Sequence, residues 1–354
     1  MKKEHILVIR FSAMGDVAMT VPVIYSLAKQ YPDVRITMLS QKFARPFFEH
    51  MPHNVGFMEA DIKNEYHGVK GLNALYRRLM AKNFTAIADL HSVLRSQYLR
   101  MRFNIDRYKV AHIDKHRTER RQITSVEHKI LRQLKTSFQN YTEVFEQLGY
   151  PIEIKFKSIF QDGGGNLSEL PETFRNKAER EKWIGVAPFA AHKGKIYPAK
   201  TMEETLNILA NKHTDAKFFM FGGGEKETSI MSQWHANNPM FINASAELNG
   251  ISDELILMNN IDVMISMDSS NMHMASLVNT PVVSIWGATH PYAGFMGWNQ
   301  DIDNAVMIDL PCRPCSIYGN KPCMRENFPC LTGITPQMIV DRVEIQLLKG
   351  KNIR

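Results

Sequence analysis

An aspartate shortly after an apolar run is the first residue whose type and position could support catalysis. Asp16 closes the segment Arg-Phe-Ser-Ala-Met-Gly-Asp, residues 10–16, which follows the apolar run 6–9. We expect a strand, a glycine turn and then a helix that begins close to Asp16, where the positive end of the helix dipole favours a carboxylate. Such a carboxylate can act as a general base. From spacing alone, an ordinary N-cap aspartate is the more common explanation.

A second group of candidates follows the strand expected at 263–266. Small polar residues open the next helix there, in the segment Asp268-Ser269-Ser270-Asn271-Met272-His273. Exposed N–H groups at a helix N-terminus form a ready site for phosphate. Simple capping by aspartate and serine is the structural alternative.

Three further expected strand ends carry residues suited to the same ligand. They are Lys193 with Lys195, Gly222-Gly223-Gly224, and Gly287-Ala288-Thr289. Glycine lets a ligand approach the backbone closely, and ligands of parallel sheets bind at the carboxyl ends of the strands. The four strand ends together therefore favour a nucleotide diphosphate. The Walker-type lysine motif is missing from the sequence, which argues against an NTPase.

The elements that must position these residues alternate between strands and helices. Strands are expected at 6–9, 34–39, 84–89, 183–187, 217–221, 263–266 and 281–286, and helices at 19–30, 126–148, 201–211 and 272–278. This alternation indicates parallel βαβ units. The chain has 354 residues, of which 44% are hydrophobic, enough for two domains. The glycine-rich stretch 162–166 predicts the connection between them.

Positive charge is concentrated in one stretch. Residues 95–135 hold twelve Lys or Arg and four acids, a formal charge of +8, whereas the whole chain carries +7. This predicts an anionic partner such as phosphate, an acidic sugar, a membrane surface or nucleic acid; the structural alternative is a solvated helical face. No familiar nucleic-acid-binding motif is present. The apolar run 6–9 is shorter than the roughly 7–15 residues of a secretory signal, so we expect a cytoplasmic protein.

All four cysteines lie within nineteen residues. Cys312, Cys315, Cys323 and Cys330 follow the spacing C-x2-C-x7-C-x6-C. Such spacing is compatible with a structural zinc site and equally with free thiols. Disulfides are disfavoured in a reducing compartment.

Several motifs, in order along the chain, resemble glycosyltransferase family 9, the ADP-heptose:lipopolysaccharide heptosyltransferases. The segments that carry the likeness are residues 10–17 with Thr20-Val21-Pro22, Lys195-Ile196-Tyr197-Pro198, Phe221-Gly222-Gly223-Gly224-Glu225, residues 266–275, and the run from Pro281 to Pro291. Two departures stand out: Ser270 and Asn271 replace the glycine region of the family signature, and His290 stands where an acid is common.

The resemblance implies an α/β protein of the GT-B fold, with two Rossmann-like lobes whose parallel sheets face a central cleft. The expected parts are an N-terminal acceptor-binding lobe (1–165), a C-terminal nucleotide-sugar-binding lobe (175–335), and a C-terminal helix (336–354) that packs back on the N-terminal lobe. Motion of the lobes would exclude water from the donor.

The same resemblance implies residue roles. Asp16 is the expected general base. The expected donor-binding residues are Lys195, Gly222, Gly223, Asp268, Ser269, Ser270, Asn271, His273, Gly287 and Thr289. The expected acceptor-binding residues are Ser12, Met14, Gly15, His91, Arg95, Arg117, Arg120 and Arg121.

The expected reaction is an inverting transfer of a heptose-like sugar, without a metal or other cofactor in catalysis. The donor is ADP-heptose or another nucleotide-sugar, and the acceptor is a lipopolysaccharide core or a related anionic glycolipid. Contact with the inner-membrane surface would be peripheral, and no nucleic-acid partner is expected. Two alternatives remain: a nucleotide-sugar epimerase of the same fold, and a non-enzymatic nucleic-acid-binding protein that uses the basic stretch 95–135.

Overall fold

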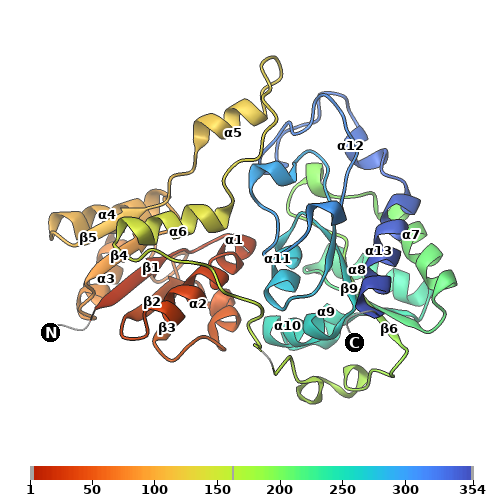
Figure 1. The fold of residues 1–354 in the computed structure, drawn as a ribbon, viewed down its shortest axis with the longest axis horizontal. Helices are drawn as coiled ribbons and strands as arrows, with labels where there is room; N and C mark the ends of the chain where they lie inside the picture. The colour runs from red at the N-terminus through yellow and green to blue at the C-terminus, as the bar shows by residue number, and fades with distance from the viewer. Residues whose placement is uncertain (1–3, 162, 352–354) are drawn as a thin grey trace. The chain divides into compact units, whose positions relative to one another are not determined.

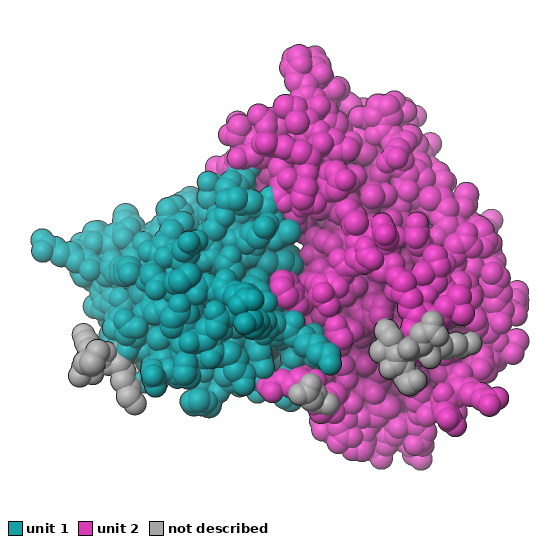
Figure 2. Space-filling view, in the orientation of Figure 1, with its two compact units in different colours: residues 1–116, 135–159 teal, residues 117–134, 160–354 magenta. Residues whose placement is uncertain are grey.

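The chain folds into two compact units. The computed structural model describes residues 4–161 and 163–351. Unit 1 comprises Met1–His116 and Lys135–Ile159, and unit 2 comprises Arg117–Leu134 and Phe160–Arg354 (Figure 2). The chain passes from unit 1 to unit 2 between Ile159 and Phe160. The stretch Arg117–Leu134 differs from expectation, because it associates with unit 2 although the chain enters and leaves it from unit 1.

Unit 1 is built on a five-stranded parallel sheet with the order β3-β2-β1-β4-β5 (Figure 1). Its strands are β1 (His5–Ile9), β2 (Arg35–Ser40), β3 (Val55–Glu59), β4 (Ala86–Asp89) and β5 (Lys109–His112). Its helices are α1 (Met14–Ala18), α2 (Val21–Gln30), α3 (Gly68–Met80), α4 (Leu94–Ile105) and α6 (Ser137–Gln147), with the 3-10 segment η1 (Lys42–Phe48). Strands β1 and β4 are buried throughout, as expected for a parallel sheet covered on both faces.

Unit 2 holds a six-stranded parallel sheet with the order β11-β10-β9-β6-β7-β8. Its strands are β6 (Lys182–Ala187), β7 (Ala216–Met220), β8 (Phe241–Asn243), β9 (Val263–Met267), β10 (Val282–Ile285) and β11 (Ala305–Val306). Its helices are α5 (Arg117–Ile123), α7 (Ala199–Lys212), α8 (Glu225–Asn237), α9 (Ala244–Glu247), α10 (Ile251–Asn260), α11 (Ser270–Leu277), α12 (Pro329–Thr332) and α13 (Pro336–Lys351). Short 3-10 turns are η2 (Leu167–Glu169), η3 (Glu172–Phe174), η4 (Lys193–Lys195), η5 (Pro291–Ala293) and η6 (Ile302–Asn304).

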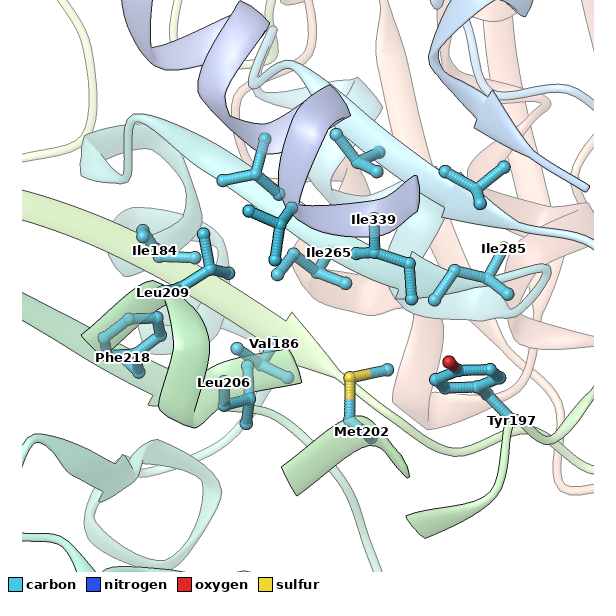
Figure 3. Close-up of a cluster of buried hydrophobic side chains, with 14 of the residues drawn as sticks. Ile184, Val186, Tyr197, Met202, Leu206, Leu209, Phe218, Ile265, Ile285 and Ile339 are labelled. Carbon is cyan, nitrogen blue, oxygen red and sulfur yellow. The ribbon is translucent and has the colours of Figure 1, made fainter. Parts of the chain in front are cut away.

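In the core of unit 2, helices pack against one face of the sheet. Side chains from the strands, including Ile184 and Ile265, meet Leu206 and Leu209 of α7 and Ile339 of α13 in one apolar cluster (Figure 3). Burial of such side chains is the dominant favourable term in folding. The sheet is therefore held firmly, and the loops at the carboxyl ends of its strands can carry the polar site.

The C-terminal helix differs from its expected place. Its apolar residues Ile339, Val340, Val343 and Leu347 belong to the buried cluster of unit 2, so α13 packs on the sheet of unit 2 rather than back on the N-terminal lobe. Residues 352–354 of the expected helix lie outside the described residues.

The long helix expected over 126–148 is half as long as predicted. Helix α6 begins at Ser137 because Thr136 caps it: the Thr136 Oγ1 accepts from the Gln139 N–H, and Gln139 Oε1 accepts from the Thr136 N–H. Such a reciprocal capping box marks the residue at which a helix begins. Just before it, the Leu134 N–H donates to the carbonyl of Tyr292, 2.8 Å away, which holds residues before 135 on unit 2.

The expected connection is also more ordered than its composition suggests. Residue 162 lies outside the described residues. Beyond it, the Gly165 N–H donates to Asn259 Oδ1 at 2.6 Å, and its carbonyl accepts from Asn260 Nδ2 at 2.8 Å. Both partners lie in α10, so this end of the connection is tied to unit 2.

Candidate functional site

The loop after β1 presents Asp16 from the first turn of α1. The Asp16 Oδ2 accepts from the Ala13 N–H at 3.2 Å and lies 2.8 Å from the Arg10 guanidinium. Arg10 is buried, with its guanidinium 5.7 Å from the centre of the Tyr141 ring, and the Tyr141 hydroxyl donates to the Asp16 carbonyl. The Asp16 side chain is 29% exposed. The carboxylate is therefore oriented from one side and accessible to a ligand from the other.

His91 lies beside this loop, at the end of the neighbouring strand β4. The Phe11 N–H donates to His91 Nδ1 at 3.3 Å, so the neutral ring carries its proton on Nε2, which lies 3.5 Å from Ser12 Oγ. Burial lowers the pKa of the His91 imidazole to about 3, and the Arg10 charge adds to the effect. His91 is therefore neutral at physiological pH and can offer an N–H near Ser12. Met14 and Gly15 lie in the first turn of α1 and are half-buried.

In unit 2, three strand ends meet at one carboxylate. Asp268 follows β9, Lys195 lies after β6, and Thr289 follows β10. The Asp268 Oδ2 lies 2.9 Å from Lys195 Nζ and accepts from Thr289 Oγ1 at 2.8 Å. All three side chains are largely buried, at 5%, 16% and 1% exposure for Asp268, Lys195 and Thr289. The ammonium can form three hydrogen bonds, so its link to Asp268 fixes its position and leaves capacity for an anionic ligand.

Helix α11 begins next to this group. Its N-cap, Ser269, makes no side-chain capping bond, and the first turn contains no acidic residue. Ser269, Ser270 and Asn271 are half-buried, and His273 is buried, 7% exposed, within the helix. An uncapped N-terminal turn presents N–H groups with a partial positive charge to an anion. The turn and Lys195 together form a cationic surface that suits phosphate oxygens.

Gly287 serves packing rather than direct approach of a ligand. A Cβ at Gly287 would lie 2.5 Å from the carbonyl oxygen of Gly194 and 2.6 Å from Leu331. The Ala288 N–H also donates to the Gly194 carbonyl at 2.8 Å. The missing side chain at Gly287 thus lets the loop that carries Lys195 rest directly on the end of β10.

The triple glycine has partners of its own. The Gly222 N–H donates to Ser245 Oγ at 3.1 Å, and the Gly223 N–H donates to Glu227 Oε2 at 2.8 Å. These two amides are satisfied within the protein, so the turn does not offer them to a phosphate. A Cβ at Gly223 would meet nothing within 4 Å. The space beside the turn is therefore open, and a ligand could lie there.

Arg313 is a residue of this site that sequence reasoning missed. It is 4% exposed, and its guanidinium donates to the carbonyls of Trp286, Gly287, Ile308 and Thr289. It therefore binds the backbone that follows β10 and the backbone that follows β11, and it fixes Thr289. A single arginine among cysteines gives little sequence signal, because only the fold brings these carbonyls together.

The basic candidates divide between the two units. Arg95 is exposed on α4 in unit 1. Arg117, Arg120 and Arg121 lie on α5, which associates with unit 2. Arg120 donates to the Tyr318 hydroxyl at 3.0 Å and lies 5.1 Å from the centre of the Phe295 ring. The expected single basic surface over 95–135 is thus carried by both units.

The cysteines are free thiols in the structure. Cys330 is buried and the other three are half-buried, and burial raises the pKa of the Cys330 thiol to about 11 and that of Cys315 above its ordinary value. Among the described residues, no three His, Cys, Asp or Glu side chains are arranged to hold a metal ion. The zinc site that the spacing permits therefore stays a prediction. Across residues 4–161 and 163–351, moreover, every helix is too short or too polar to span a bilayer.

The chain is similar to several known proteins. It is 22% identical over 317 residues to the lipopolysaccharide core heptosyltransferase OpsX of Haemophilus influenzae, covering 86% of this chain and 84% of that protein. It is 19% identical over 342 residues to lipooligosaccharide heptosyltransferase 2 of Campylobacter jejuni, covering 94% and 95%.

Two solved structures share the fold. E. coli ADP-heptose LPS heptosyltransferase II superimposes with a TM-score of 0.69 at 17% identity, covering 98% of this chain and 99% of that one. The E. coli heptosyltransferase WaaC with ADP gives 0.68 at 16% identity, covering 97% and 99%. The two parallel α/β units are those of the GT-B fold, as the sequence predicted.

The family model of glycosyltransferase family 9 (heptosyltransferase) matches residues 72–322, well over half of the chain, and includes the Lys195, Asp268 and Thr289 group. The chain therefore belongs to glycosyltransferase family 9, and it is a heptosyltransferase-like glycosyltransferase.

Proposed function

We propose that this glycosyltransferase moves a heptose-like sugar from an ADP-sugar to the core of a lipopolysaccharide or a related anionic glycolipid, with inversion at the anomeric carbon and without a metal ion. The observation that carries the donor half is the group formed by Lys195, Asp268 and Thr289 beside the uncapped start of α11. The names of the relatives support the sugar and the acceptor, and the ADP bound to E. coli WaaC supports the nucleotide.

In the proposed reaction, Asp16 removes the proton from the acceptor hydroxyl as that oxygen attacks the anomeric carbon. The bond between this carbon and the diphosphate oxygen breaks at the same time, and the electron pair leaves with ADP. Attack opposite the leaving group inverts the anomeric carbon. Lys195 and the first amides of α11 stabilise the charge that develops on the leaving diphosphate. The chain itself supplies these groups, which supports a step without a metal ion.

Each remaining candidate has a proposed part. Asp268 and Thr289 position Lys195, and His273 supports the helix start from within. Gly222, Gly223 and Gly287 give the loops their shape, and Ser269, Ser270 and Asn271 contact the diphosphate. On the acceptor side, Ser12, Met14, Gly15 and His91 surround the hydroxyl near Asp16. Arg95, Arg117, Arg120 and Arg121 attract the acceptor's phosphates or carboxylates, and the lipid anchor of the acceptor brings the enzyme to the inner-membrane surface.

The test is an Asp16→Asn variant, which keeps the size of the side chain and removes the base. We expect transfer from ADP-heptose to a core acceptor to fall by about 10²–10⁴-fold, with the Kd for ADP unchanged by calorimetry. The matched control is Asp33→Asn, an exposed carboxyl of the same unit, which should retain full activity. Full transfer by Asp16→Asn would contradict the proposed base, and tighter binding of UDP or GDP than of ADP would contradict the proposed donor.

A further inference from the structure

Helix α4 carries an apolar stripe on its outward face. Leu94, Met101 and Ile105 are 85%, 48% and 66% exposed, and their spacing of seven and four residues places them on one side of the helix. The opposite side buries Leu99 and Phe103 in the core of unit 1. Single exposed apolar side chains are ordinary, but three in line on one helix indicate an interaction surface.

Helix α3 packs beside α4 and extends this stripe with Val69. The Tyr98 hydroxyl of α4 donates to Asn73 Oδ1 of α3 at 2.9 Å, and one turn further along both helices the rings of Tyr76 and Phe103 lie 4.9 Å apart. The two helices therefore run in the same direction. Val69, which is 63% exposed, lies one turn before Asn73 and hence alongside the first turn of α4.

The segment that carries the stripe has a positive formal charge. Residues 94–109 contain five basic side chains and one acidic side chain, a formal charge of +4. The single acid, Asp106, accepts a hydrogen bond from the Tyr76 hydroxyl, and Arg100 lies 3.4 Å from the buried Asp89. Arg95 and Arg107 remain exposed next to the apolar side chains.

We propose that this face of unit 1, formed by Leu94, Met101 and Ile105 of α4 with Val69 of α3, is the surface by which the protein binds an anionic lipid bilayer. Apolar side chains enter the boundary between headgroups and acyl chains, while exposed arginines pair with lipid phosphates. The combination of an apolar stripe and positive charge selects this partner. A second copy of the chain would bring two positive faces together, which is unfavourable.

The binding test uses sedimentation with vesicles and does not depend on activity. The test variant is Leu94→Gln/Met101→Gln/Ile105→Gln, which removes the stripe and keeps every charge. The matched control is Ile302→Gln/Met324→Gln/Leu348→Gln, three side chains of unit 2 that are 40%, 67% and 58% exposed. We expect wild type and control to bind vesicles of phosphatidylglycerol and phosphatidylethanolamine, and the test variant to show a roughly tenfold or larger fall in partition coefficient. Binding to pure phosphatidylcholine should be weak for all three proteins.

Equal vesicle binding by the test variant and wild type would overturn the proposal, and so would equal binding of wild type to both kinds of vesicle. A dimer of the wild type that the test variant loses would assign the stripe to a second copy and also overturn it.

A second readout rests on the proposed function. The test variant should lose transfer to an acceptor embedded in vesicles but keep transfer to the same acceptor after removal of its acyl chains, and equal loss on both acceptors would contradict the proposal. If wild type binds vesicles through the stripe but transfers no sugar to either acceptor, the membrane surface is supported and the proposed function fails.

Discussion

At the scale of single residues, the donor group depends on one shared carboxylate. Asp268 Oδ2 contacts both Lys195 Nζ and Thr289 Oγ1, so the position of the ammonium is set by a buried partner and by the end of a neighbouring strand. A buried charge that has a fixed partner loses little freedom when a ligand arrives, which favours binding. The sequence shows these residue types, but it does not show that they converge on one oxygen atom.

Replacing the lysine tests this arrangement. We expect Lys195→Met to weaken ADP binding by about 10–100-fold, since a hydrogen bond to a charged group contributes about 1.5–3 kcal/mol. Lys193→Met is the matched control, because Lys193 is exposed in the same loop. Titration calorimetry measures both, and an equal effect of the two substitutions would show that Lys195 acts only through general positive charge.

His91 predicts a loss of stability in acid. Its pKa is lowered from 6.5 to about 3 in the folded protein, so below pH 6.5 the unfolded chain binds a proton that the folded chain does not. The stabilising effect is complete above pH 6.5 and is lost as the pH falls toward 3. Between pH 7 and pH 5 this costs about 2 kcal/mol of the free energy of unfolding.

Urea unfolding of unit 1 at the two pH values measures the effect. The His91→Gln variant should lose about 2 kcal/mol less than wild type between pH 7 and pH 5. His53→Gln, at an exposed histidine, should follow the wild type. An unchanged pH dependence in His91→Gln would show that the folded protein protonates the ring.

At the scale of elements, loops at the ends of β6 and β10 are stacked through glycines. Gly287 lies under the Gly194 carbonyl, and Gly319, whose φ is +74°, lies against the Lys195 side chain, so that a Cβ there would meet Lys195 Cγ at 2.6 Å. Arg313 then ties the carbonyls of this region together. The site is therefore a packed assembly of loops, and backbone contacts position the loop that carries Lys195.

A single methyl group tests this packing. Gly287→Ala should destabilise unit 2 by about 1–3 kcal/mol, as overpacked core positions do, and it should also weaken ADP binding because the Lys195 loop must move. Gly223→Ala is the control, since a Cβ there meets nothing within 4 Å, and its thermal midpoint should match wild type. Equal midpoints for the two variants would contradict the close packing of these loops.

At the scale of the whole molecule, the chain consists of two units with separate cores. The proposed nucleotide site lies entirely in unit 2, whereas Asp16 and His91 lie in unit 1. A ligand stabilises the unit to which it binds by mass action. ADP at about 100 times its Kd should therefore stabilise unit 2 by about 2.7 kcal/mol.

Hydrogen exchange locates this effect. With ADP, protection should rise in β6, β9, β10 and α11 and remain unchanged in β1 and β4. Adenosine serves as the control, because it lacks the diphosphate and should protect these elements much less. Stronger protection of unit 1 than of unit 2 would indicate that ADP binds to unit 1, which would contradict the donor assignment.

The sequence alone was sufficient for the class of fold and for strands β1, β2, β4, β6, β7, β9 and β10, whereas it did not predict β3, β5, β8 and β11. Local signals account for this: the apolar runs 6–9 and 263–266 each end at polar or small residues, and strands of this type occur in parallel sheets. The segment 268–273 was correctly identified as the start of helix α11. The glycine turn expected after residue 13 is instead the short helix α1, and the helix expected over 19–30 begins at Val21 as α2. The roles of residues 10–17 and 268–273 in catalysis and binding stay predictions.

Only the tertiary structure decided the features that depend on contacts between distant residues. The Tyr292 carbonyl holds the chain at Leu134, which separates the residues before 135 from helix α6. The capping pair Thr136 and Gln139, by contrast, is a local signal that marks the start of α6. Helix α13 joined the core of unit 2 because its apolar face completes that sheet's packing. The same holds for the close packing at Gly287, for the carbonyls that Arg313 binds and for the shared oxygen of Asp268. A sequence records which groups are present, whereas their close approach is fixed by packing between segments that are far apart along the chain.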